Sequence, residues 1–287
     1  MTVYEQILEA RDDMTNWLVH FTRGEGGMTS RQVLLKILSE GILRPGWAMR
    51  TRGSTAVPNR TVFGPTPAVC FSEQPVGALL KYVAVRPMAQ PFGVFVHKHD
   101  AFADGALPVI YGLHGARELR PGDVGYVTGQ RTLDPTELEL DQQYRYVTFA
   151  LHRYGSEQPI DWTHEREWRW SSRPRGHAIE GGFPLNGSLA STGLGASEGR
   201  VHVFVEKDAD IAWFKANLTA AWNGVKNGPA ASQNVNYRGW LDRWFENLQH
   251  AVDVFSLEDA ARQLALGNRC VYRLEGWLQG RTRVPIV

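Results

Sequence analysis

The sequence has few cysteines, no long apolar run and no excess of charge of either sign. Its 287 residues contain two cysteines, Cys70 and Cys270, whose wide separation fits neither a disulfide framework nor a zinc-ligand spacing. No stretch approaches the about 18–20 apolar residues of a membrane span, so no membrane partner is expected. The first residues are acidic and include no apolar segment, which argues against a signal peptide. These absences predict a protein of the reducing cytoplasm.

The charge balance also excludes an overall basic surface. Lys and Arg number 31 and Asp and Glu 30, giving a net charge of +1, so a strongly basic nucleic-acid surface is not expected, although a local basic patch is compatible with it. The hydrophobic fraction of 43% is sufficient for a sizeable core in one large domain or two small ones. Ten tryptophans are many for this length, and some are expected to line a pocket or an interface.

Hydrophobic periodicity predicts strands and helices in mixed order. Thr29 or Ser30 is expected to begin a helix, Gly41 to end it, and Ser256 to cap a later helix. The expected strands are 17–22, 68–73, 92–96, 108–111, 200–206, 252–255 and 270–272. The expected helices are 2–13, 30–40, 78–82, 144–153, 210–222, 240–250 and 257–266. Irregular segments are expected at 47–67, 121–141, 174–199 and 224–233.

The segment 47–67 is rich in Arg, Gly and Pro and shows little periodicity. With the residue just before it, it carries Arg44, Arg50, Arg52 and Arg60. Long irregular loops in compact domains are often functional, but a solvated charged loop has the same composition, and both interpretations stay open here.

The strongest candidate for chemistry is the stretch 161–170, in which two carboxylates lie two residues apart between aromatic and arginine residues. In a β-strand, Glu165 and Glu167 project to the same face, while Arg166 and Trp168 project to the other. Like charges on one face repel unless they are used, for example to orient a nucleophile and to stabilise a developing positive charge. The alternative is an amphipathic edge strand whose carboxylates pair with the neighbouring Arg166 and Arg169.

A metal site is a weaker possibility, and none is expected. His97 and His99 would share one face of a strand near Asp100, and a second set is Asp161, His164 and Glu165. Because no third ligand follows His97 and His99 at a suitable spacing, a solvated strand end is the preferred interpretation.

Three segments in this order resemble the ADP-ribosyltransferase fold. They are a strand ending in His20-Phe21-Thr22, followed by a helix and Gly41-Ile42-Leu43; a strand with Cys70-Phe71-Ser72-Glu73; and a late strand with Glu165-Arg166-Glu167. The groups most similar are the DarT-like and AbiGi-like proteins of bacterial toxin–antitoxin and phage-defence systems. The resemblance covers residues 17–170 and implies an α+β fold with a split β-sheet core and flanking helices.

The resemblance assigns most of the expected NAD-binding residues to the first strand and the loop behind it. His20 would hydrogen-bond the adenosine ribose of NAD, with Phe21 beside it and Thr22 on the nicotinamide side. In DarT-like enzymes an arginine from the loop after the first helix contributes, and Arg50 or Arg52 fits that position. A satisfied core histidine is the structural alternative for His20.

The resemblance also names the reacting groups. Glu167 is the first choice for the catalytic glutamate, binding the nicotinamide-ribose hydroxyl, and Glu165 is the second, orienting the acceptor nucleophile. Ser72 takes the place of the second-strand serine. Tyr82 and Tyr111 are candidates for stacking on nicotinamide, although each would also suit a core position.

The expected organisation is an ADP-ribosyltransferase-like core at 1–185 and a C-terminal α/β extension at 186–287, which could also belong to the same compact domain. The implied function is transfer of ADP-ribose from NAD, as substrate, to a macromolecule, with DNA or RNA favoured over protein, by a toxin or anti-phage effector that an antitoxin protein could neutralise. The alternatives are an NAD glycohydrolase and a non-catalytic antitoxin or sensor on the same scaffold. The sequence lacks a Rossmann-type glycine fingerprint, which this fold does not need.

Overall fold

The computed structural model divides the chain into two compact units. Unit 1 comprises residues 1–43, 73–103 and 184–287, and unit 2 comprises 44–72 and 104–183. The residues that the structure describes are 11, 13–50, 59–85, 91–113, 117–149, 161, 163–172, 181–185, 201–250, 252–268, 274 and 286. The chain contains helices together with both parallel and antiparallel strand pairs, so the fold is of the expected mixed α+β class.

The strands of unit 1 form a mixed sheet in the order β13-β12-β6-β1. β1 (Trp17–Phe21) and β12 (Val201–Val205) both run antiparallel to β6 (Gly93–His97), and β13 (Val252–Ser256) runs parallel to β12. The C-terminal strands therefore share a sheet with the first strand of the chain.

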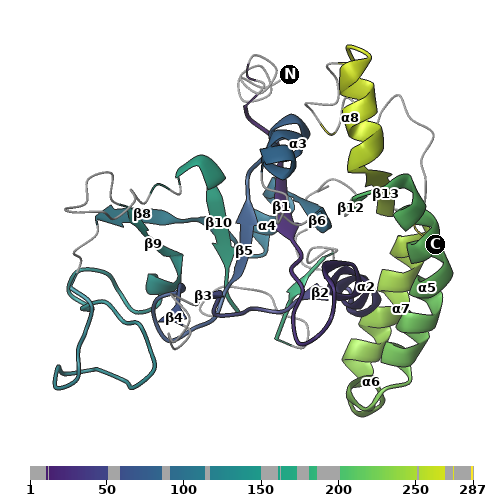
Figure 1. Cartoon of the computed structure of the whole chain (residues 1–287). Coiled ribbons are helices and arrows are strands. Elements are labelled where there is room, and N and C mark those ends of the chain that lie inside the picture. The colour runs from purple at the N-terminus through teal and green to yellow at the C-terminus, as the bar shows by residue number, and fades with distance from the viewer. Residues whose placement is uncertain are drawn as a thin grey trace. The chain divides into compact units, whose positions relative to one another are not determined.

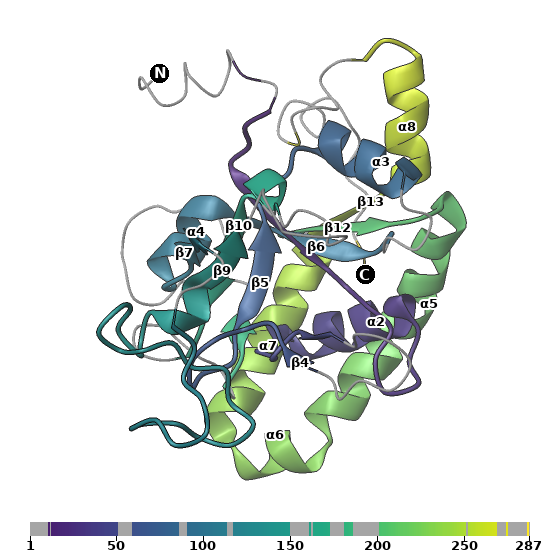
Figure 2. The ribbon, with the colours of Figure 1, turned by 60° about the vertical axis from the view of Figure 1, so that its left-hand side comes forward.

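Helices cover both faces of this sheet (Figures 1 and 2). On one side lie α2 (Ser30–Glu40), α5 (Asp208–Lys226) and α7 (Val235–His250), with the short α6 (Pro229–Gln233) between the last two. On the other side lie α3 (Val76–Val85) and α8 (Leu257–Ala265), which pack over the aromatic residues of the strands; α4 (Lys98–Ala103) follows β6. The resulting core holds Trp17, Val19, Phe95, Phe204 and Phe255.

The predicted helix ends of unit 1 are confirmed. The Thr29 side chain accepts from the backbone N–H of Gln32, whose own side chain accepts from the backbone N–H of Thr29, and this capping box begins α2. Gly41 ends the helix with φ 69°, a left-handed conformation that favours glycine. Ser256 caps α8 through the backbone N–H of Asp259.

Unit 2 is built on short strands with a long irregular segment between them. β10 (Glu167–Trp170) pairs antiparallel with both β5 (Val69–Ser72) and β7 (Leu107–Pro108). Two further pairs are β8 (Ile110–Leu113) with β9 (Tyr146–Phe149), which is parallel, and β3 (Met49–Arg50) with β4 (Asn59–Arg60), which is antiparallel. The apolar side of β5 and β10 packs Phe71 and Trp170 against Phe183.

Several sequence predictions are wrong in detail. Residues 143–149 form a single 3-10 turn, η1 (Gln143–Arg145), and then β9, where a helix was expected, because β9 pairs with β8 and buries Tyr146 and Val147. The segment 47–67 contains the β3–β4 pair, and α5 and α6 occupy much of 224–233. The remaining short strands are β2 (Ile42–Leu43) and β11 (Phe183–Pro184).

Other expectations lie wholly or largely outside the described residues: the helix at 2–13, the loop at 174–199 and the strand at 270–272. Among the helices that the structure describes, none is both long and apolar enough to cross a membrane.

Candidate functional site

The register of β5 and β10 gathers polar side chains on one face of the pair. Glu167 lies opposite Ser72 and Arg169 lies opposite Cys70. Because side chains alternate along a strand, these four share a face, while Phe71 and Trp170 occupy the apolar face behind it. An otherwise buried strand pair of unit 2 therefore presents a carboxylate, a guanidinium, a hydroxyl and a thiol together.

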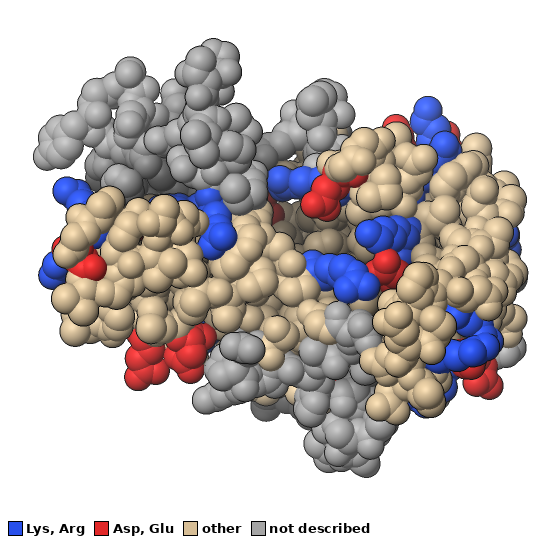
Figure 3. Space-filling model, turned by 90° about the horizontal axis from the view of Figure 1, so that it is seen from below, with Lys and Arg blue, Asp and Glu red and all other residues tan. Residues whose placement is uncertain are grey.

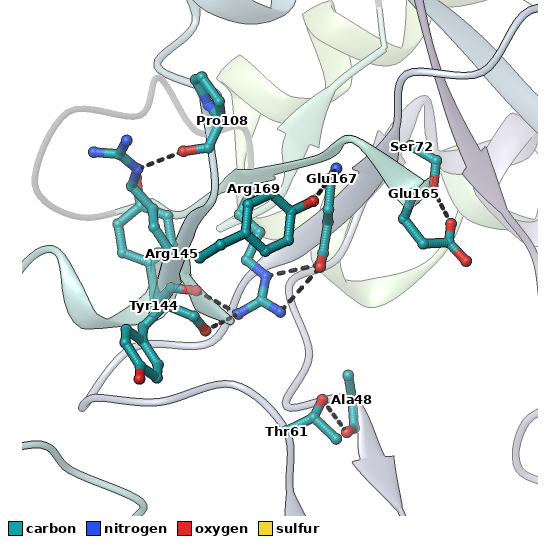
Figure 4. A network of polar contacts seen from close by, with 11 residues as sticks. Ala48, Thr61, Ser72, Pro108, Tyr144, Arg145, Glu165, Glu167 and Arg169 are labelled. Carbon is teal, nitrogen blue, oxygen red and sulfur yellow. Dashed lines mark hydrogen bonds and ion pairs between the residues drawn. The ribbon is translucent and has the colours of Figure 1, made fainter. Parts of the chain in front are cut away.

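Arg169 fixes the Glu167 carboxylate. Its Nε donates to Glu167 Oε1 at 2.8 Å and its Nη2 to Oε2 at 3.3 Å, which makes a two-point ion pair (Figure 4). Its Nη1 donates to the carbonyl oxygens of Tyr144 at 2.7 Å and Tyr146 at 3.2 Å. Arg169 is only 4% exposed, so a rigid and buried donor holds the orientation of Glu167.

Burial and charge oppose one another at Arg169. Burial by itself lowers the pKa of the guanidinium, but the Cys70 sulfur and the Glu167 carboxylate outweigh it and raise the pKa above its ordinary value. Arg169 therefore stays positively charged throughout the physiological range.

Glu165 reaches the same site by a different route from the expected one. The prediction that it shares a strand with Glu167 is wrong, because Glu165 ends a 3-10 turn, η2 (Thr163–Glu165), and Arg166 has φ 45°. The left-handed residue breaks the strand alternation between the two glutamates. Even so, the Ser72 hydroxyl donates to Glu165 Oε2 at 2.8 Å, so the serine opposite Glu167 joins Glu165 to the site (Figure 4).

The two glutamates thus have different partners. The second Glu165 oxygen lies 3.6 Å from His164 Nε2, and both carboxylates keep limited solvent access, at 17% of the side chain for Glu165 and 16% for Glu167. Arg169 donates to the Glu167 carboxylate and the Ser72 hydroxyl donates to the Glu165 carboxylate, and this difference suits a division of chemical roles.

Tyr111 completes the group. Its hydroxyl oxygen accepts from the backbone N–H of Glu167 at 3.4 Å, and the residue is 36% exposed. Partial burial, and after it the carboxylates of Glu167 and Glu165, raise the pKa of the phenol, which is therefore protonated at neutral pH. Tyr111 offers an aromatic ring with solvent access beside the carboxylates.

The expected residues of the first strand lie in unit 1. Phe21 packs against Tyr82 at 5.8 Å between ring centroids and against Phe204 at 6.0 Å. Thr22 is buried, and its hydroxyl lies 3.1 Å from the carbonyl oxygens of Ser30 and Phe92, which it can donate to. His20 precedes Phe21 on β1, lies opposite Val94 and is partly exposed.

The side chains of the two arginines expected to contribute lie outside the described part of the chain. Arg50 belongs to β3, and Arg52 lies outside the described residues. Within the described part of the chain, no group of three or more His, Cys, Asp or Glu residues could hold a metal ion. The strand that was to bring His97 and His99 to one face ends at His97, and α4 begins at Lys98.

The sequence suggested Arg169 only as an ion-pair partner of the carboxylates in the structural alternative, and the structure shows this pair with Glu167. The signal was present in the spacing, because Arg169 follows Glu167 by two positions and so shares its face of a strand. What the spacing could not reveal is that the tertiary structure buries this face against the carbonyl oxygens of Tyr144 and Tyr146.

Comparisons with known proteins give no relative from which a role could be taken. No family model, no curated protein and no solved structure matches this chain.

Proposed function

We propose that the protein transfers ADP-ribose from NAD to a macromolecular acceptor, with nucleic acid favoured over protein, and that the group around β5 and β10 carries the chemistry. The observation that carries the proposal is the pair of glutamates with unlike partners: Glu165 held by the Ser72 hydroxyl and Glu167 held by Arg169. The resemblance of the sequence to DarT-like and AbiGi-like proteins supports the choice of NAD and a role as a toxin or phage-defence effector.

In this proposal Glu167 acts on the nicotinamide ribose. Cleavage breaks the bond between ribose C1′ and the nicotinamide nitrogen, the electron pair leaves with nicotinamide, and an oxocarbenium-like ribose develops. A carboxylate that accepts a hydrogen bond from the ribose hydroxyl stabilises that positive charge. The buried Arg169 supports this role because it holds the carboxylate in one orientation before the substrate arrives.

Glu165 acts on the acceptor. A new bond forms from the acceptor nucleophile to C1′, and Glu165 takes the proton that the nucleophile loses. The Ser72 hydroxyl donates to this carboxylate and orients it. Tyr111 provides a flat ring beside the two carboxylates, on which nicotinamide can stack.

Two alternative functions would use the same scaffold, and experiment can distinguish them from transfer of ADP-ribose to a macromolecule. With water in place of the macromolecule, the same groups make an NAD glycohydrolase. A binding protein without turnover would be an antitoxin or a sensor, and the chain would then bind NAD or a partner without releasing nicotinamide.

The test is nicotinamide release from NAD by purified protein, alone and with added DNA, RNA or cell lysate. Release that rises with one additive identifies the acceptor class, whereas equal release without any additive identifies a glycohydrolase. Glu167→Gln is expected to abolish release and keep the fold, whereas Glu139→Gln, a change at an exposed carboxylate of the same unit, should leave release unchanged. Full turnover by the Glu167→Gln variant would remove the central assignment.

A further inference from the structure

Four cations of the described residues stack on aromatic rings, and three of them are also neutralised by a carboxylate. The three are Arg31 on Trp213 with Asp210, Arg131 on Phe63 with Glu118, and Lys226 on Trp222 with Asp242. The fourth is Arg60, whose guanidinium carbon lies 3.9 Å from the centroid of the Trp47 ring. No described Asp or Glu pairs with Arg60, and its buried Nη1 has no hydrogen-bond partner within the same part of the chain.

The backbone holds this stack firmly within unit 2. Trp47 packs against the cluster of Val62, Ala68 and Tyr144, and its carbonyl oxygen accepts from the backbone N–H of Thr61 at 3.2 Å. Arg60 pairs with Met49 in the β3–β4 ladder, and its carbonyl oxygen accepts from Arg131 at 3.1 Å. The guanidinium is therefore presented by an ordered element and is only partly buried.

The surrounding sequence leaves the charge of Arg60 without local compensation. Residues 44–72 contain Arg44, Arg50, Arg52 and Arg60 and no Asp, Glu or Lys. On the face drawn in Figure 3, positive and negative side chains are interspersed. The overall charge of +1 therefore conceals a segment in which every charged residue is an arginine.

We propose that Arg60, stacked on Trp47, is a binding platform for a single-stranded nucleic acid. The guanidinium donates to a phosphate and its planar face stacks on an unpaired base, while Trp47 holds it flat from below. Single strands combine exposed base faces with a charged backbone, and this is the chemistry that an unneutralised arginine–tryptophan stack matches. The claim that this platform holds the acceptor of ADP-ribose rests on the proposed function. The claim that it binds a single-stranded nucleic acid does not, because that binding needs no NAD.

The experiment measures binding of a fluorescent single-stranded oligonucleotide of about 16 nucleotides, as DNA and as RNA, by fluorescence anisotropy without NAD. Arg60→Gln is expected to weaken binding about tenfold, since one stacked and phosphate-bound contact is lost. It should also reduce the slope of log K against log salt by about 0.7. The matched control is Arg31→Gln, which removes an arginine that is also stacked on an aromatic ring but already paired with Asp210, and the affinity of this variant should stay within about twofold.

Arg60→Lys is a second variant, for use if Arg60→Gln folds poorly. It keeps the positive charge, so the dependence of binding on salt should stay unchanged, but the affinity that stacking of the guanidinium contributes should be lost. Equal affinity of Arg60→Gln and the unchanged protein would overturn the platform, as would a wild-type protein that binds neither oligonucleotide. Equal binding of the corresponding duplex, or displacement by AMP at the oligonucleotide's own concentration, would overturn the choice of a single strand. Nicotinamide release is measured on the same preparations to separate the platform from the proposed transferase activity. A variant that loses NAD turnover but binds the oligonucleotide unchanged bears on the site at Glu167 alone.

Discussion

Replacing Arg169 with methionine removes the buried cation of the site and leaves its partners in place. Methionine is unbranched and apolar, so it fills the space of the arginine stem without a charge. Glu167 then loses both of its guanidinium donors, and the carbonyl oxygens of Tyr144 and Tyr146 lose theirs. The substitution therefore tests whether the ion pair is the structural centre of unit 2.

The expected cost follows from the burial of the pair. Removing one partner of a buried ion pair costs about 3–5 kcal/mol, because the remaining charge stays desolvated. Arg169 keeps 5% of its side chain exposed and Glu167 keeps 16%, so water reaches the glutamate in part and the expected loss is about 3 kcal/mol. Removing the glutamate charge as well, in Arg169→Met/Glu167→Gln, should restore part of the stability, with a coupling of about 1–3 kcal/mol.

Urea unfolding followed by circular dichroism measures both quantities. We expect a lower unfolding midpoint for Arg169→Met, and a smaller loss of stability for the double variant than for Arg169→Met alone. A single variant within about 0.5 kcal/mol of the wild-type protein would show that the pair contributes little, as exposed pairs do. A double variant less stable than Arg169→Met would show that the cost comes from lost packing.

Further predictions concern the site and the core. Glu165→Gln is expected to change the ratio of transfer to hydrolysis while NAD is still cleaved, and quantifying free ADP-ribose against modified acceptor tests this; an unchanged ratio would contradict the role of Glu165. For Tyr111, the folded-state pKa is raised above its ordinary value of 10.0, so its contribution to stability is present below that pH and is lost as pH rises through the raised value. Tyr111→Phe should therefore lose less stability than the wild-type protein above about pH 10, and identical alkaline melting profiles would refute the shift. Gly41→Ala should lower the free energy of unfolding by more than about 1 kcal/mol, because φ is 69° and the new Cβ would lie 2.6 Å from the Trp244 ring; a thermal melt that matches the wild-type protein would contradict it.

Local chemistry made the ends of several elements predictable from sequence. Thr29 with Gln32, Gly41 and Ser256 act within a few residues of chain, so their caps needed no knowledge of the fold. In the expected helix at 240–250, Trp240, Leu241, Trp244 and Leu248 recur at helical spacing, and the structure buries all four on α7.

The failures arose where distant segments decide the conformation. Residues 146–149 have mixed periodicity that was interpreted as a helix, and only pairing with β8 makes them a strand. The two glutamates were expected on one strand, but Arg166 takes a left-handed conformation and Glu165 reaches Ser72 from a 3-10 turn. Spacing in a sequence presumes regular backbone, and a single residue with positive φ removes that regularity.

The sequence by itself determined the α+β class, the caps and the two carboxylates worth examining, because periodicity, capping and composition act over short stretches of chain. Only the tertiary structure decided what each carboxylate contacts. It placed Ser72 opposite Glu167 and within reach of Glu165, buried Arg169 beneath them, and left Arg60 on Trp47 without a carboxylate partner among the described residues. The physical reason is that the interaction energy of a charged group depends on its neighbours and on its access to water, and both are set by segments far apart in the chain.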